Sequence, residues 1–181
     1  MDMHEEEHHD EDEDHDEEEH EEGHDDHGGL ILANYLQEDA ELDGYELEIG
    51  RVFNLASGDL EVSFSRDVVN GSLSSGMNIP RMSPARNIYS VGYSVNDYLF
   101  DLSFKDVDSQ TDTAEEESAT SGYQMLDAKL VRTFDLNGSS LRVSVFANNL
   151  LDEVARNHAS FVKNQVPLPG KNFGLRFNLS F

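Results

Sequence analysis

The sequence predicts an all-β fold: a segment of an antiparallel transmembrane β-barrel with about seven strands, preceded by a disordered, acidic, His-rich N-terminal loop. Three observations predict it. After Gly28-Gly29, apolar and polar residues alternate with the period of two that strands require. Short and long connections between these segments follow each other in strict alternation, as they do in membrane barrels. Segments of about 9–11 residues also match the thickness of a bilayer.

The N-terminal block, residues 1–27, holds 17 carboxylates and 7 histidines and no Lys or Arg. It has no apolar face to bury, and its like charges repel one another, so we expect residues 1–29 to be disordered. The block contributes −17 to a formal net charge of −26. We expect no nucleic-acid partner, because an acidic chain is repelled by phosphates.

The histidines of this block are candidate metal ligands. Imidazole and carboxylate groups suit Zn²⁺, with Ni²⁺ and Cu²⁺ also possible, and the carboxylates concentrate cations. Their spacing is loose, which indicates a flexible capture segment and not a rigid site; the alternative is an acidic tail with incidental histidines. The candidate ligands are His4, His8, His9, His15, His20, His24 and His27. The chain has no Cys, which excludes a thiolate zinc site and a disulfide framework.

Alternation predicts seven strands, and it is clearest in the last nine residues, where every second residue is Phe or Leu. We expect the strands near 30–53, 59–69, 86–95, 97–107, 122–134, 140–149 and 172–181. The short connections are NLASGD, Asn96-Asp97 and DLNGSS, which contain turn-forming residues. The long connections are about 70–85, 108–121 and 150–171.

The first predicted strand contains Asp43-Gly44, a dipeptide that favours a hairpin turn. A turn there would give eight strands, which could close as a small barrel. It would also place two short connections in succession and break the alternation. We therefore expect one long strand that projects beyond the membrane, with Gly44 at a bend or bulge.

Each apolar stripe taken alone also fits a soluble sheet packed on a core. Two features favour the membrane. The polar faces carry charged residues that suit a wet lumen, and aromatic residues occur near strand ends, where membrane barrels place their girdles. The charged and amide residues are Asp101, Lys105, Arg142, Arg176 and Asn178, and the aromatic residues are Tyr98, Phe104, Phe134, Phe173 and Phe181. The sequence has no apolar run of about 18 residues that would predict a transmembrane helix.

The C-terminal segment FANNLLDEVARNHASFVKNQVPLPGKNFGLRFNLSF, residues 146–181, resembles the end of TonB-dependent outer-membrane receptors of the zinc-uptake type. The segments QEDAELDGYELEIG and NIPRMSPAR resemble preceding parts of the same family, so the likeness covers about 30–181. The resemblance implies location in the outer membrane of a Gram-negative cell, with residues 1–29 extracellular. It also implies uptake of a metal, with Zn²⁺ as the captured or transported ligand and no required cofactor.

The family builds a 22-stranded barrel around an N-terminal plug. The resemblance therefore implies four partners: outer-membrane lipid, the remainder of the barrel and plug, the TonB system acting through that plug, and the barrel-assembly machinery, which would read the strand ending in Phe181. This sequence holds about the last seven strands, without a plug or a TonB-contacting segment. We expect a receptor fragment whose two open edges need strands from elsewhere.

No catalytic constellation stands out, so we expect no enzyme activity. His158, in the loop before the last strand, is expected to be packed or hydrogen-bonded near the barrel rim and not to bind metal. Two other interpretations stay open at this point. One is a soluble periplasmic metal-binding β protein with a His-rich tail, and the other is a small eight-stranded outer-membrane barrel.

Overall fold

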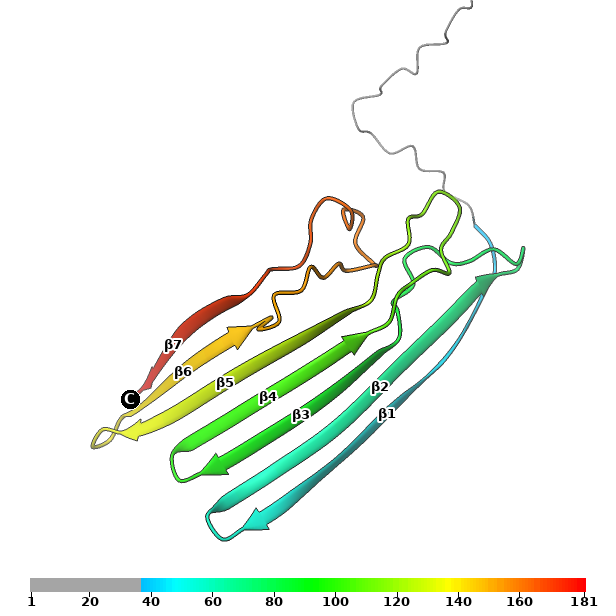
Figure 1. Cartoon of the computed structure of the whole chain (residues 1–181). Helices are drawn as coiled ribbons and strands as arrows, with labels where there is room; N and C mark the ends of the chain where they lie inside the picture. Colours follow the sequence, from blue (N-terminus) through cyan, green and yellow to red (C-terminus); the bar gives the residue numbers. More distant parts are fainter. Residues whose placement is uncertain (1–36) are drawn as a thin grey trace, which may run out of the picture. The chain divides into compact units, whose positions relative to one another are not determined.

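The computed structural model describes residues 37–181, which form one antiparallel sheet with its seven strands in chain order (Figure 1). The strands are β1 (Ala40–Leu55), β2 (Gly58–Leu73), β3 (Arg86–Val95), β4 (Tyr98–Val107), β5 (Tyr123–Asp135), β6 (Ser140–Asn148) and β7 (Asn172–Ser180). The all-β prediction is confirmed for these residues. Within 37–181, no helix is long and apolar enough to cross a membrane.

The start of the first strand was predicted wrongly within the described residues. Residues 37–39 precede the sheet, and β1 begins at Ala40, not near residue 30. These residues bind the segment after β2: the backbone carbonyl of Asp39 accepts the N–H of Ser74 at 2.9 Å, and the Glu38 carboxylate accepts the Ser74 hydroxyl at 2.9 Å. One backbone bond and a side-chain contact to the loop therefore follow the end of the strand ladder here. Residues 30–36 lie outside the described part.

The dipeptide Asp43-Gly44 lies inside β1 and forms neither a turn nor a bulge. Its residues pair with Asn70 and Val69 of β2 in an unbroken register. A Cβ atom on Gly44 would collide with the backbone carbonyl oxygen of Val68. The glycine therefore allows close approach of two backbones. This corrects the expected bend and excludes the eight-stranded alternative that needed a hairpin at this position.

Short and long connections leave the sheet at opposite ends, as predicted (Figure 1). The short turns are 56–57, 96–97 and 136–139, and the long loops are 74–85, 108–122 and 149–171. Asn96 has a φ of 50°, a left-handed conformation that Asn tolerates in tight hairpin turns. We refer below to the short-turn end and the long-loop end of the sheet.

The described residues form a single layer with almost no hydrophobic core. Only Val107, Val131 and Ala155 are buried apolar residues among them. A soluble sandwich buries one face of each sheet against a second layer. Residues 37–181 contain no second layer, and β1 and β7 each pair on one side only. The sheet is therefore open at both edges.

Candidate functional site

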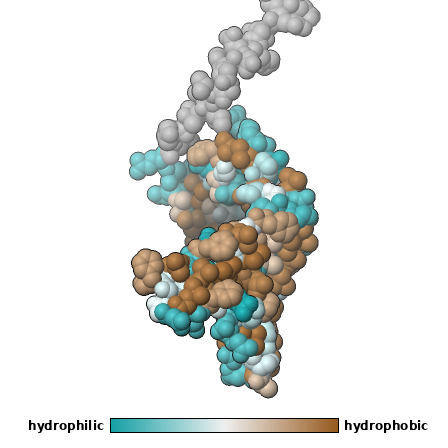
Figure 2. All heavy atoms as spheres, turned by 90° about the vertical axis from the view of Figure 1, so that its left-hand side faces the viewer, coloured by the Kyte–Doolittle hydropathy of each residue, from teal (hydrophilic) through white to brown (hydrophobic). Residues whose placement is uncertain are grey.

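The strand register gathers the apolar residues of all seven strands on one face of the sheet. One lateral row, for example, runs from Leu60 through Tyr93, Phe100, Leu130 and Val145 to Leu175. This apolar face also contains Tyr45, Leu47, Ile49, Phe53, Val62, Phe64, Tyr89, Val91, Leu102, Phe104, Leu126, Ala128, Val143, Ala147, Phe173, Phe177 and Leu179. Figure 2 shows hydrophobic residues gathered over the middle of the molecule, with hydrophilic residues towards its ends.

Large apolar side chains on this face remain uncovered by the rest of residues 37–181. Phe177 is 64% exposed, and Phe173, Leu175 and Leu179 are similarly exposed. Aromatic rings also pack side by side across strands near the long-loop end. The ring centroid of Tyr89 lies 5.0 Å from that of Phe64 and 6.2 Å from that of Phe104. An apolar surface of this extent marks contact with a membrane or another protein.

The opposite face is polar and carries cross-strand ion pairs. Asp67 Oδ1 lies 2.6 Å from Arg86 Nε, and Asp101 Oδ2 lies 3.2 Å from Lys129 Nζ. Both pairs are partly exposed, so each stabilises the sheet only slightly. Partly exposed charges of this kind favour an aqueous environment on this polar face.

The last strand divides its residues between these faces as the sequence predicted. Phe177 pairs with Val143 on the apolar face, and Leu175 pairs with Val145. Arg176 and Asn178 alternate with them and lie on the polar face. The division of residues is therefore confirmed.

Arg51 and Arg132 on the apolar face both lie against aromatic rings. The guanidinium carbon of Arg132 is 4.9 Å from the ring centroid of Tyr98 and 4.4 Å from that of Phe134. The guanidinium carbon of Arg51 is 5.0 Å from the ring centroid of Phe53. All of these residues lie near the short-turn end of their strands. Amphipathic side chains of this kind occupy the interface between an apolar phase and water.

At the other end of the sheet, the three long loops meet around one carboxylate. Glu117 Oε1 accepts a hydrogen bond from Lys163 Nζ at 2.8 Å and lies 3.1 Å from His158 Nε2. Both oxygens of Glu117 accept the backbone N–H of Arg81, at 3.0 and 3.1 Å. Glu117 belongs to loop 108–122, Arg81 to loop 74–85, and the other two residues to loop 149–171. One side chain thus joins all three loops.

Further contacts tie the same loops together. The Asn78 amide donates to the carbonyl oxygen of Thr113 at 3.0 Å, and the Ser118 hydroxyl pairs with the Asn164 amide at 2.8 Å. The Arg81 guanidinium carbon lies 3.6 Å from the ring centroid of Phe161. We call the residues that join the loops around Glu117, namely Arg81, Glu117, Thr120, His158, Phe161 and Lys163, the loop cluster.

His158 is the most deeply placed ring of the loop cluster, with an exposed fraction of 1%. Its Nδ1 lies 2.9 Å from the Thr120 hydroxyl oxygen. Lys163 Nζ is nearly equidistant from Nδ1 and Nε2, at 3.5 and 3.3 Å, which places the ammonium over the ring and out of line with either lone pair. Both ring nitrogens are engaged by protein groups, as expected for a packed His and not for a free ligand.

Burial and the nearby Lys163 ammonium lower the pKa of His158, although Glu117 acts in the opposite direction. We assign a neutral ring that donates from Nε2 to Glu117 and accepts from Thr120 at Nδ1. For Glu117, burial alone would raise the pKa, but hydrogen bonds from Lys163 and from the N–H groups of Arg81 and Ala114 outweigh it. The net pKa of Glu117 is lowered, so this carboxylate is ionised at neutral pH.

The seven histidines predicted to bind metal all lie outside the described residues. Among residues 37–181, no group of three or more His, Asp or Glu side chains is arranged to hold a metal ion. The described part therefore contains a sheet with one apolar and one polar face and a joined loop end, and the prediction for the histidines of residues 1–27 stays a prediction.

The sequence did not predict the loop cluster. Glu117, Thr120 and Lys163 carry no periodic signal, and their partners lie about 36–46 positions away. His158 was expected to be packed or hydrogen-bonded, as it is, but the sequence did not indicate its partners. The one available signal was topological: three long loops on neighbouring hairpins must leave the sheet side by side.

Comparison with known proteins supports the fold. No protein-family model and no curated protein sequence matches the chain. Among solved structures, it is similar to the copper transporter OprC, with a TM-score of 0.71 and 18% sequence identity. The match covers 80% of this chain and 24% of that chain, so this chain spans about a quarter of its length. The likeness establishes a shared arrangement of strands.

Proposed function

We propose that residues 37–181 form part of the wall of an outer-membrane β-barrel that transports a metal, with Zn²⁺ as the cargo, in a TonB-dependent manner. The main support for this proposal is that the sheet is a single layer with one apolar and one polar face. Its apolar face is uncovered within the described residues, and its polar face bears hydrated ion pairs. In a barrel, the first face contacts lipid and the second lines the aqueous lumen.

The ends of the sheet support an orientation. Membrane barrels have short periplasmic turns and longer extracellular loops. By this rule, turns 56–57, 96–97 and 136–139 are periplasmic, and the loop cluster is extracellular. Residues 1–29 precede a strand that begins at the long-loop end, which supports an extracellular place for the acidic His block.

The metal part of the proposal rests on the chemistry of the His block and on the likeness to OprC, which is a copper transporter. Histidine nitrogen and carboxylate oxygen suit both Zn²⁺ and Cu²⁺. The resemblance of residues 146–181 to zinc-type receptors favours Zn²⁺. In this proposal the block gathers cations at the cell surface, and the metal is cargo.

The open edges support a role within a larger barrel. Unpaired backbone groups in hydrocarbon cost several kcal/mol each, so β1 and β7 require partner strands. We propose that the remainder of a receptor barrel supplies them, that a plug in its lumen makes the contact with TonB, and that β7 and Phe181 engage the barrel-assembly machinery. A soluble periplasmic protein would leave the apolar face in water, so the fold disfavours that alternative.

Single-cysteine labelling tests the proposed placement, because the chain contains no Cys of its own. In cells carrying the assembled receptor, a membrane-impermeant maleimide should label Val154→Cys in loop 149–171 without permeabilisation. It should label Ser57→Cys only after the outer membrane is opened. Phe177→Cys should stay unlabelled in the intact membrane, whereas Asn178→Cys should react once the lumen is accessible.

Two results would contradict the placement. Equal labelling of Phe177→Cys and Asn178→Cys would show that both faces meet water. Recovery of the chain in the periplasmic soluble fraction, with Val154→Cys protected in intact cells, would instead favour the soluble alternative.

A further inference from the structure

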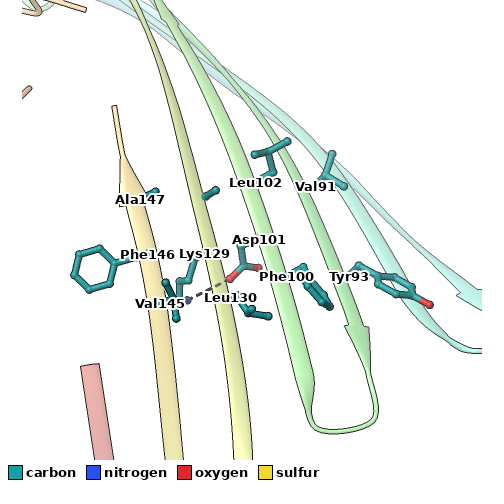
Figure 3. A pocket seen from close by; sticks show the side chains of 11 residues that line it. Val91, Tyr93, Phe100, Asp101, Leu102, Lys129, Leu130, Val145, Phe146 and Ala147 are labelled. Carbon is teal, nitrogen blue, oxygen red and sulfur yellow. Dashed lines mark hydrogen bonds and ion pairs between the residues drawn. The ribbon is translucent and has the colours of Figure 1, made fainter. Parts of the chain in front are cut away.

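A hollow in the apolar face lies beside Arg132 and has no role in the wall itself. It has a volume of about 400 Å³ and spans β3 to β6. Figure 3 shows two rows of apolar side chains along it, one from Tyr93 to Val145 and one from Val91 to Ala147. Asp101, Lys129 and Phe146 lie between these rows along their strands and point to the polar face, so their backbone forms the floor.

Small residues create this hollow. Ala128 and Ala147 pair across β5 and β6 on the apolar face. Their neighbours in the lower row are the larger Leu130 and Val145, which also pair with each other. Two methyl side chains beside larger ones lower this part of the face and leave an apolar groove that crosses β5 and β6.

Arg132 lies two residues beyond Leu130 on the same face of β5, towards the short-turn end, at about 7 Å along the strand. It pairs laterally with Tyr98 and Val143. Its side chain is exposed, and no carboxylate of residues 37–181 forms an ion pair with it. At the edge of a lipid-facing surface, a lipid phosphate can pair with this guanidinium and offset the cost of a charge near hydrocarbon.

We propose that Arg132 and this groove form a binding site for one glycerophospholipid of the periplasmic leaflet. The guanidinium binds the lipid phosphate, held in place by the rings of Tyr98 and Phe134. One acyl chain lies in the groove over Ala128 and Ala147. The periplasmic leaflet is the source because Arg132 lies at the short-turn end, and this assignment rests on the proposed function.

Native mass spectrometry of the assembled receptor, extracted in mild detergent and titrated with phosphatidylglycerol, tests the site. The parent protein should retain one lipid, and Arg132→Gln should weaken retention by about tenfold or more, since hydrogen bonds to charged groups are lost. Arg132→Lys should restore part of it. Ala128→Leu and Ala147→Leu, which fill the groove and keep Arg132, should each weaken retention.

Arg51→Gln is the matched control, because Arg51 also lies over a ring on the apolar face but belongs to β1, outside the four strands that line the groove. It should retain lipid as the parent does. Equal retention by the parent and Arg132→Gln, or equal loss with Arg51→Gln, would overturn the site while leaving the barrel wall intact. Absence of the chain from the membrane fraction would overturn the proposed function instead.

Discussion

At the scale of single residues, the face on which a side chain lies decides its tolerance to charge. Phe177 and Asn178 are adjacent in β7 and point to opposite faces. If the apolar face contacts lipid, Phe177→Lys should destabilise the assembled barrel by about 2–4 kcal/mol near the midplane. Asn178→Lys should cost much less, because the lumen is hydrated. Urea unfolding of both variants in lipid vesicles measures the difference, and equal costs would contradict the membrane assignment.

Glu117 is the residue on which the three long loops depend. Glu117→Gln removes the charge that faces the buried Lys163 ammonium, which is only 6% exposed, and breaking such a pair costs about 3–5 kcal/mol. We expect all three loops to become sensitive to protease together. Limited proteolysis with peptide mapping measures this, and exposed Glu116→Gln is the control. Cleavage confined to loop 108–122 would show that the loops are independent.

Acidification should loosen the loop cluster, and the pKa directions give the sign. The folded pKa of His158 and that of Glu117 are both lowered, so each group binds protons more readily when the cluster opens. Stability from His158 should decline as pH falls below 6.5, the ordinary pKa of histidine, and stability from Glu117 should decline below 4.5, the ordinary pKa of glutamate. Proteolysis of the loops at a series of pH values measures the decline. In His158→Gln the decline that begins near 6.5 should disappear, and its persistence would assign that step to another group.

The His block should bind Zn²⁺ through imidazole and not only through negative charge. Imidazole must be neutral to bind metal, so zinc binding should weaken as pH falls through about 6.5, where the carboxylates are still ionised. Calorimetric titration of residues 1–29 with Zn²⁺ at about pH 7.5 and about pH 5.5, with Mg²⁺ in excess, measures this. The control peptide carries Gln at all seven His positions. If it binds zinc as well as the parent, the histidines are incidental.

At the scale of elements, the pairing of β1 with β2 depends on Gly44, which has no Cβ and therefore lets the backbone of β2 approach closely. Gly44→Ala would place a Cβ against the Val68 carbonyl oxygen and 3.1 Å from Val69 Cα, so it should destabilise this hairpin by about 1–3 kcal/mol. Gly50→Ala is the matched control, because its Cβ would meet only Ser63 Cβ at 3.6 Å and the Val62 carbonyl oxygen at 3.7 Å. The temperature at which the assembled barrel loses its gel shift measures both. Similar losses would indicate that β propensity, and not the contact, sets the cost.

At the scale of the whole molecule, strand direction limits how this sheet closes. Seven antiparallel strands leave β1 and β7 running in the same direction, and β1 has 16 residues against 9 in β7. Direct closure, or a ring of copies, would require a parallel seam between strands of unequal length. We therefore expect the isolated chain to show no heat-resistant, faster-migrating species in detergent. A monodisperse monomer with that gel shift would overturn this expectation.

The alternation of apolar and polar residues in β7 and in the other strands was enough to predict seven strands and the faces of their residues. This is because the two-residue period is a local property of a strand. The short turns could also be predicted from the sequence, because residues such as Asn96 favour tight turns through their own conformational preferences. The N-terminal charge block was evident from composition alone.

Only the tertiary structure showed that Asp43-Gly44 forms neither a hairpin turn nor a bend, because the deciding contact comes from Val68 on another strand. It also assembled the loop cluster, where Glu117 meets Arg81 and Lys163 from loops far away in the sequence. Contacts of this kind depend on which loops the register brings side by side. They have no period and no fixed spacing, so the sequence contains no pattern that predicts them. Alternation along a strand is such a pattern, and it predicts the strand.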